Sequence, residues 1–91
     1  MTHLIPNLMK GLGIRFALHQ QLSMWDAAAA DVVSALTIAL LLLQEEAPPE
    51  PLMQEFATLL EQLHALSQAE RAQLYAALGE WAEVVKELVE E

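Results

Sequence analysis

The sequence predicts an all-α fold: a small bundle of three to four helices with a C-terminal antiparallel helical hairpin. Apolar residues recur every three or four positions through residues 52–91, and the run at 27–43 is apolar on nearly every side. The chain has 91 residues, which suits one domain, and its hydrophobic fraction of 55% exceeds the usual ~45–50%. We therefore expect a single helical domain, residues 1–91, in which another chain covers part of the apolar surface, so that the protein is oligomeric.

The hairpin, residues 52–91, carries the clearest helical pattern. The stripe of its first helix is Leu52, Phe56, Leu59, Leu63 and Leu66. The stripe of its second helix is Leu74, Leu78, Trp81, Val85 and Leu88. Ser67 followed by Glu70 predicts a capping box at the start of the second helix. Gly79 lies inside that helix and costs about 1 kcal/mol relative to Ala. The short connection between the two stripes predicts antiparallel neighbours.

A long apolar helix is expected over residues 23–46, beginning at Ser23 with Asp26 completing a second capping box. One of its stripes is expected to pack on the hairpin, and this stripe consists of Val33, Leu36, Leu40 and Leu43. Asp31 and Ser34 lie roughly opposite and mark a solvated flank. A proline-rich linker, residues 47–51, ends the helix because proline cannot continue it.

The N-terminal segment, residues 1–22, is ambiguous between a helix, a strand and an arm that orders on binding. Arg15 and His19 fall among its apolar helical positions, and Gly11 and Gly13 weaken a helix further. The alternation over residues 14–19 would also suit a strand, but no other segment of the chain offers a partner strand. We therefore favour a helix.

The second apolar side of the long helix is the candidate interface. Ile38, Leu41 and Leu42 have no internal partner once the first stripe packs on the hairpin. Trp25, in the first turn, is a further candidate because tryptophan is enriched in interface hot spots. These four residues form the predicted protein-interface site.

Charge is distributed unevenly, because residues 44–91 carry the whole net charge of −9. Clustered Lys and Arg are needed to bind phosphates, so nucleic acid is not an expected partner, whereas a protein with a basic surface is. The uninterrupted apolar stretch is far shorter than the ~20 residues of a membrane span, so no membrane association is expected. The absence of cysteine excludes disulfides and suits a cytoplasmic location.

Chemistry-bearing motifs are scarce. Glu61 and His64 form an E-x-x-H, a spacing found in di-iron bundles, but they point away from the predicted core stripe. His3, His19 and His64 are scattered, and no catalytic or phosphate-binding motif occurs. We therefore expect no enzyme, cofactor or metal.

These observations predict a non-enzymatic protein–protein interaction module that forms a homodimer or higher oligomer through its central apolar helix. One alternative is an acidic adaptor, assembly factor or inhibitor that docks on a basic partner protein. The other is a metal-binding helical bundle.

Overall fold

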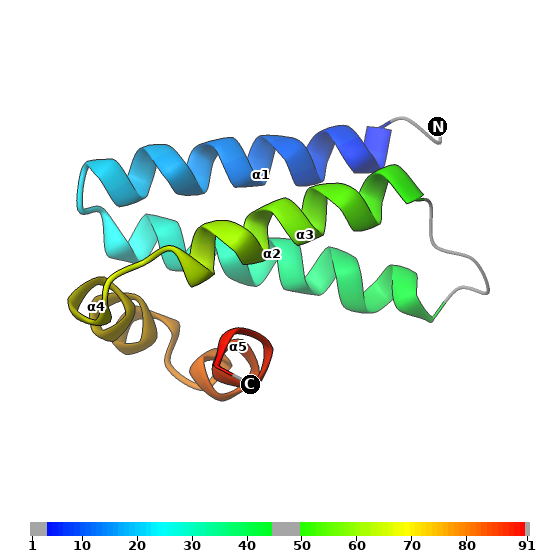
Figure 1. The fold of residues 1–91 in the computed structure, drawn as a ribbon. Coiled ribbons are helices and arrows are strands. Elements are labelled where there is room, and N and C mark those ends of the chain that lie inside the picture. The colour runs from blue at the N-terminus through cyan, green and yellow to red at the C-terminus, as the bar shows by residue number, and fades with distance from the viewer. Residues whose placement is uncertain (1–3, 45–49, 91) are drawn as a thin grey trace.

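The computed structural model describes residues 4–44 and 50–90, and every regular element within them is an α-helix (Figure 1). The helices are α1 (Leu4–Gln21), α2 (Trp25–Leu43), α3 (Glu50–His64), α4 (Gln68–Leu78) and α5 (Trp81–Val89). The predicted all-α class is confirmed, and the ambiguous N-terminal segment is helical from Leu4. Residues 1–3 and 45–49 lie outside the description, including His3, the predicted end of the long helix and most of the predicted linker.

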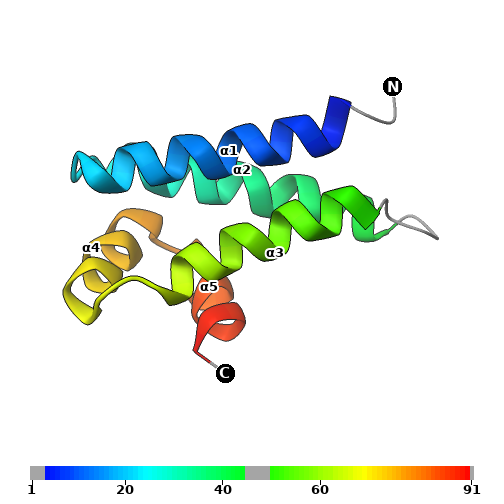
Figure 2. The ribbon, with the colours of Figure 1, turned by 45° about the horizontal axis from the view of Figure 1, so that its top comes forward.

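The five helices surround one core. α1, α2 and α3 run along the long dimension of the molecule, with α2 antiparallel to the other two, and α4 and α5 cross below them (Figures 1 and 2). α1 packs on α2 and α3, α4 packs on α2, and α5 packs on α3 and α4. The largest fully buried side chains are Phe16, Met9, Leu52, Leu59, Leu74, Val32 and Val85. The N-terminal helix therefore contributes two of the largest side chains of the core, Phe16 and Met9.

The predicted C-terminal hairpin is wrong in two respects. Residues 68–89 form two helices instead of one, because the chain breaks at Gly79, where φ is +62° and ψ is −124°. In addition, α4 packs on α2 and α5 instead of running back along α3. The break also changes which side of the last helix is buried: Ala82, Val85 and Val89 face the core, while Leu88 is 39% exposed.

Gly79→Ala is expected to destabilise the fold by about 1–3 kcal/mol, since this backbone conformation is strained for any residue with a Cβ. A Cβ at Gly79 would meet no atom within 4 Å, so the cost arises from the backbone alone. Gly11→Ala is the matched control: its added Cβ also meets nothing, but Gly11 is helical, so alanine should stabilise by about 0.5–1 kcal/mol. Urea unfolding measures the free energy of unfolding of both variants. Stabilisation by Gly79→Ala would contradict the break between α4 and α5.

The predicted capping box at the start of α4 is confirmed. The Ser67 hydroxyl accepts from the Glu70 backbone N–H at 3.1 Å, and the Glu70 carboxylate accepts from the Ser67 N–H at 3.0 Å. Glu70 also accepts from the Gln20 side-chain amide at 3.1 Å, which ties the start of α4 to the end of α1. The hydrogen bonds from the Ser67 backbone and from Gln20 lower the pKa of Glu70 below its usual 4.5.

Acidification is expected to remove the contribution of Glu70 to stability. Its pKa is lower in the folded protein than in the unfolded chain, so the contribution is present above about pH 4.5 and is lost as the pH falls through the folded value. Glu70→Gln should therefore lose less stability than the wild type between about pH 5 and pH 3. Thermal unfolding followed by circular dichroism tests this expectation. Equal losses in the two proteins would contradict it.

The predicted start of the long helix at Ser23 is wrong. Ser23 has a positive φ of 56° and lies in the turn between α1 and α2, while Met24 is the N-cap of α2 and makes no side-chain cap hydrogen bond. The backbone N–H groups of Ser23 and Met24 donate to the carbonyls of Gln20 and His19. Ser23 therefore helps to end α1 instead of starting α2.

The buried side of α2 also differs from the prediction. Leu36 is buried and Val33 is half-buried, but Leu40 is 48% exposed, and the side chain of Leu43 lies outside the description. The core side consists mainly of small residues: Ala28, Ala29, Val32, Ala35, Leu36 and Ala39. Because α1 packs against α2, the buried face of α2 is rotated by roughly 60° from the predicted stripe, at ~100° per residue.

Candidate interaction surfaces

The predicted interface residues of α2 lie beside α1 at one end of the bundle. Leu41 is 62% exposed, whereas Ile38 and Leu42 are half-buried and pack against the edge of the core. Together with Leu8 of α1, these three residues line an apolar hollow of about 180 Å³. α1 thus covers part of the predicted site and leaves Leu41 open to solvent.

Further apolar side chains of α1 extend this surface. Leu8 and Leu18 are each 52% exposed, and Leu22 is 60% exposed. The facing side of α2 carries small residues at helical spacing, Ala27, Ala30 and Ser34. We call the combined surface the α1/α2 face: Leu8, Leu18, Leu22, Ala27, Ala30, Ser34, Ile38, Leu41 and Leu42. The sequence pattern missed its α1 half because residues 1–22 could not be assigned to a helix with certainty.

Trp25 lies in the first turn of α2, outside the α1/α2 face as defined. Its side chain is half-buried and packs against the edge of the core. The residues of the α1–α2 turn and the first turn of α2, from Ser23 to Ala27, line a second hollow that includes it. The structure therefore places Trp25 away from Leu41, near the opposite end of the same helix.

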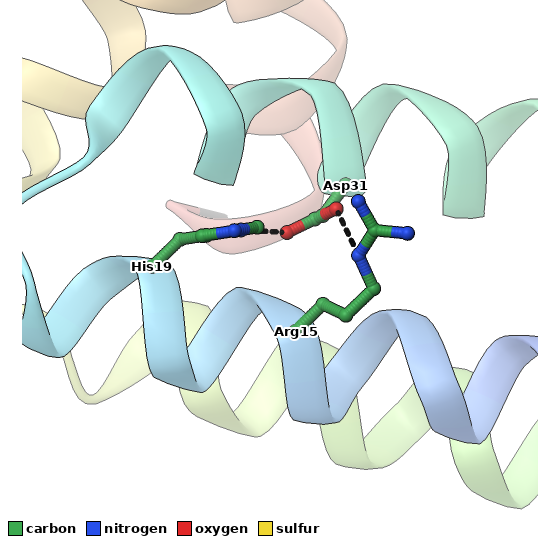
Figure 3. A network of polar contacts seen from close by, with 3 residues as sticks. All are labelled: Arg15, His19 and Asp31. Atoms are coloured by element: carbon green, nitrogen blue, oxygen red, sulfur yellow. Dashed lines mark hydrogen bonds and ion pairs between the residues drawn. The ribbon is translucent and has the colours of Figure 1, made fainter.

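A polar network joins α1 to α2 in the middle of the pair (Figure 3). Asp31, predicted to lie on a solvated flank, is instead buried, with 3% of the residue exposed. Its Oδ2 lies 2.6 Å from His19 Nδ1, and its Oδ1 lies 3.5 Å from Arg15 Nε. A buried carboxylate needs such partners because an unpaired charge in an apolar interior is costly. Ser34, the other residue of that predicted flank, is exposed.

The side chains of the network differ in their access to solvent. The His19 side chain is 16% exposed, while the Arg15 side chain is 67% exposed and reaches the carboxylate from outside. His19 and Arg15 are four residues apart on α1, so one helical face presents both to Asp31. The network thus links α1 to α2 and gives the buried carboxylate of Asp31 two polar partners.

A third hollow lies between α2 and α5, and two of its residues, Leu40 and Trp81, were predicted to belong to the core. Leu40, Trp81, Val84 and Glu80 line it. Trp81 is half-buried instead of enclosed, and Leu40 is 48% exposed. The prediction for Leu40 is wrong because the alanines of α2 face the core, whereas Trp81 does pack against the edge of the core.

The E-x-x-H pair, Glu61 and His64, is exposed on α3. Within the described residues, no three His, Asp or Glu side chains come close enough to hold a metal ion. Neither residue takes part in the surfaces above.

The stretch Trp25–Leu42 is long and apolar enough to cross a membrane by length and composition, with a mean hydropathy of 1.6, and 39% of it is buried inside the protein. Core helices of soluble proteins meet the same criteria, so this stretch does not by itself assign a membrane location. No family model matches the chain, and neither a curated protein nor a solved structure shows significant similarity to it.

Proposed function

We propose that this protein is a non-enzymatic interaction module that self-associates as a homodimer through the α1/α2 face. The observation that carries the proposal is the exposure of large apolar side chains from both helices on one surface. Leu41 is 62% exposed and Leu22 is 60% exposed, values that leave most of each side chain in water. Exposed apolar surface marks sites of association, and here it lies at both ends of the face, with the exposed Arg15 side chain between them.

The distribution of charge favours a second copy of this chain as the occupant. Residues 4–44, which form α1 and α2, contain Lys10, Arg15, Asp26 and Asp31 and carry no net charge, although the whole chain carries −9. Pairing through the acidic α3–α5 side would bring like charges together, which disfavours association. Pairing through the neutral α1/α2 face keeps the acidic sides of both copies apart.

The size of the face also suits a dimer. α1 has 18 residues, so it is about 27 Å long, and two helices side by side are about 20 Å wide. The footprint of roughly 500 Å² is of the same order as the ~800 Å² that each partner buries in a standard interface. In a two-fold dimer the same patch is used twice, and two helix pairs combine into a four-helix layer.

Light scattering coupled to size-exclusion chromatography, over loading concentrations from about 5 to 200 μM, tests the proposal. We expect the mass of a dimer at the upper concentrations. Raising the NaCl concentration should leave the dimer intact or strengthen it, because salt screens the repulsion between two acidic chains while apolar contacts persist. A monomer at every concentration would contradict the proposal.

A further inference from the structure

The hollow between α2 and α5 is a second apolar surface, separate from the α1/α2 face. We call it the α2/α5 notch: Leu40, Glu80, Trp81 and Val84, which line a shallow, open hollow of about 400 Å³. Leu40 and Val84 expose 48% and 38% of their surface. Leu88, one turn beyond Val84 and 39% exposed, extends the apolar stripe along α5. The notch therefore offers a half-buried tryptophan and aliphatic walls to a side chain from outside.

Acidic side chains border this stripe. Glu83 and Glu87 are exposed on α5, and the exposed Glu80, the N-cap residue of α5, lines the notch. Within the described residues, Glu83 reaches Lys86 at 4.0 Å, while Glu80 and Glu87 form no ion pair. The rim of the notch is thus negative and largely uncompensated.

The two cations of residues 50–90 both lie close to α4. The Lys86 ammonium lies 5.3 Å from the centroid of the Tyr75 ring. Arg71 donates to the His64 carbonyl at 2.8 Å and lies 3.7 Å from Glu90. Burial, followed by the nearby Glu90 carboxylate, raises the pKa of Tyr75 above its usual 10. Arg71 is thereby held away from the notch, and Lys86 pairs with Glu83 alone, which leaves Glu80 and Glu87 without a cation.

We propose that the α2/α5 notch binds a basic amphipathic segment of a different protein. A large apolar side chain of that segment enters beside Trp81, and its Lys or Arg residues contact Glu80 and Glu87. Tryptophan in a partly enclosed pocket is a common hot spot, and opposite charges at the rim speed association and set specificity. A helix with an apolar face and a basic face presents both features at matching spacing.

The negative charge of the rim also disfavours two other occupants, a second copy of this chain and an anionic membrane surface. A second copy of this chain has four Lys and Arg in total, and two of them are engaged at α4, so it offers no basic stripe. Anionic membrane surfaces attract basic segments, so they would repel the acidic rim. A basic protein segment is the occupant that matches both the apolar walls and the charge.

The test uses a synthetic amphipathic helix of Leu and Lys, about five turns long, and the same peptide with Glu in place of Lys. Trp25→Phe leaves Trp81 as the sole tryptophan, so a blue shift of its emission reports entry into the notch. We expect the Lys peptide to bind at least about tenfold more tightly than the Glu peptide, and more weakly as NaCl increases. Absence of binding, or binding without a change in Trp81 emission, would overturn the proposal.

Two matched pairs of variants locate the site. Val84→Lys should weaken binding by about tenfold, whereas Ile14→Lys, which adds the same charge at an exposed residue between α1 and α3, should change it by less than about twofold. Glu80→Gln should weaken binding more than Glu61→Gln, which removes an exposed carboxylate from α3. Equal effects within either pair would show that the peptide binds the acidic surface without the notch. Binding should persist in a monomeric protein, so failure here leaves the dimer proposal untouched.

Discussion

Leu41→Glu is expected to convert the proposed dimer into a monomer without unfolding the chain. In a two-fold interface each substitution occurs twice, and each introduced carboxylate would be buried without a partner. A loss of at least about 3 kcal/mol corresponds to a dimer dissociation constant more than ~100-fold higher. The fold should persist because Leu41 is 62% exposed in the isolated chain. Sedimentation velocity gives the oligomeric state, and circular dichroism gives the helical content.

Ile14→Glu provides the matched control for this substitution. Ile14 is also 62% exposed, but it lies in the groove between α1 and α3, next to Lys10, and outside the α1/α2 face. We expect this variant to remain a dimer, while Leu22→Glu, at the other end of the face, should dissociate like Leu41→Glu. Dissociation by Ile14→Glu, or a dimer that persists in Leu41→Glu, would show that the face does not mediate association.

The N-terminal helix shows where the sequence pattern was informative and where it misled. Met9 and Phe16 are fully buried, yet Arg15 and His19 interrupted the apolar pattern around them. The reason lies on another helix: both residues contact Asp31, which itself looked like a solvated interruption of α2. The polar residues that interrupt the apolar pattern of α1 are therefore the partners of the acid that interrupts the apolar pattern of α2. An isolated acid in one apolar helix and isolated bases in a neighbouring segment are the signal that could have indicated their contact.

The rotation of α2 could not be predicted because its sequence is apolar on almost every side. Leu41 was identified correctly as lacking an internal cover, but Leu40 was assigned to the core and is 48% exposed. Leucines were preferred over alanines as core residues, whereas close packing with α1 places Ala28 and Ala35 inside. The stripe of the first hairpin helix was predicted well because its polar face is distinct: Leu52, Leu59 and Leu63 of α3 and Leu66 just after it are buried, and Phe56 is half-buried.

Asp31→Ala is expected to be strongly destabilising, by about 2–3 kcal/mol. It removes a short hydrogen bond between a carboxylate and His19, and such bonds to charged groups are each worth ~1.5–3 kcal/mol. The ion pair with the exposed Arg15 adds at most about 1 kcal/mol, and the lost carboxylate no longer has to be desolvated, which limits the total. Asp31→Asn should cost roughly half as much, because an amide oxygen can still accept from the imidazole. Urea unfolding measures both variants.

The double variant His19→Leu with Asp31→Leu distinguishes a stabilising network from one that aligns the helices. Replacing a buried polar pair by apolar side chains is often neutral or stabilising by about 1–4 kcal/mol, so the double variant should recover the loss seen in Asp31→Ala. Unfolding is best measured in the Leu41→Glu background, because the stability of a dimer depends on its concentration. A double variant less stable than Asp31→Ala would show that the network stabilises the fold beyond what apolar packing supplies. Recovery of stability would instead mean that Asp31, the only charged residue buried within residues 4–44 and 50–90, adds no net stability over apolar packing, which favours a role in aligning α1 on α2.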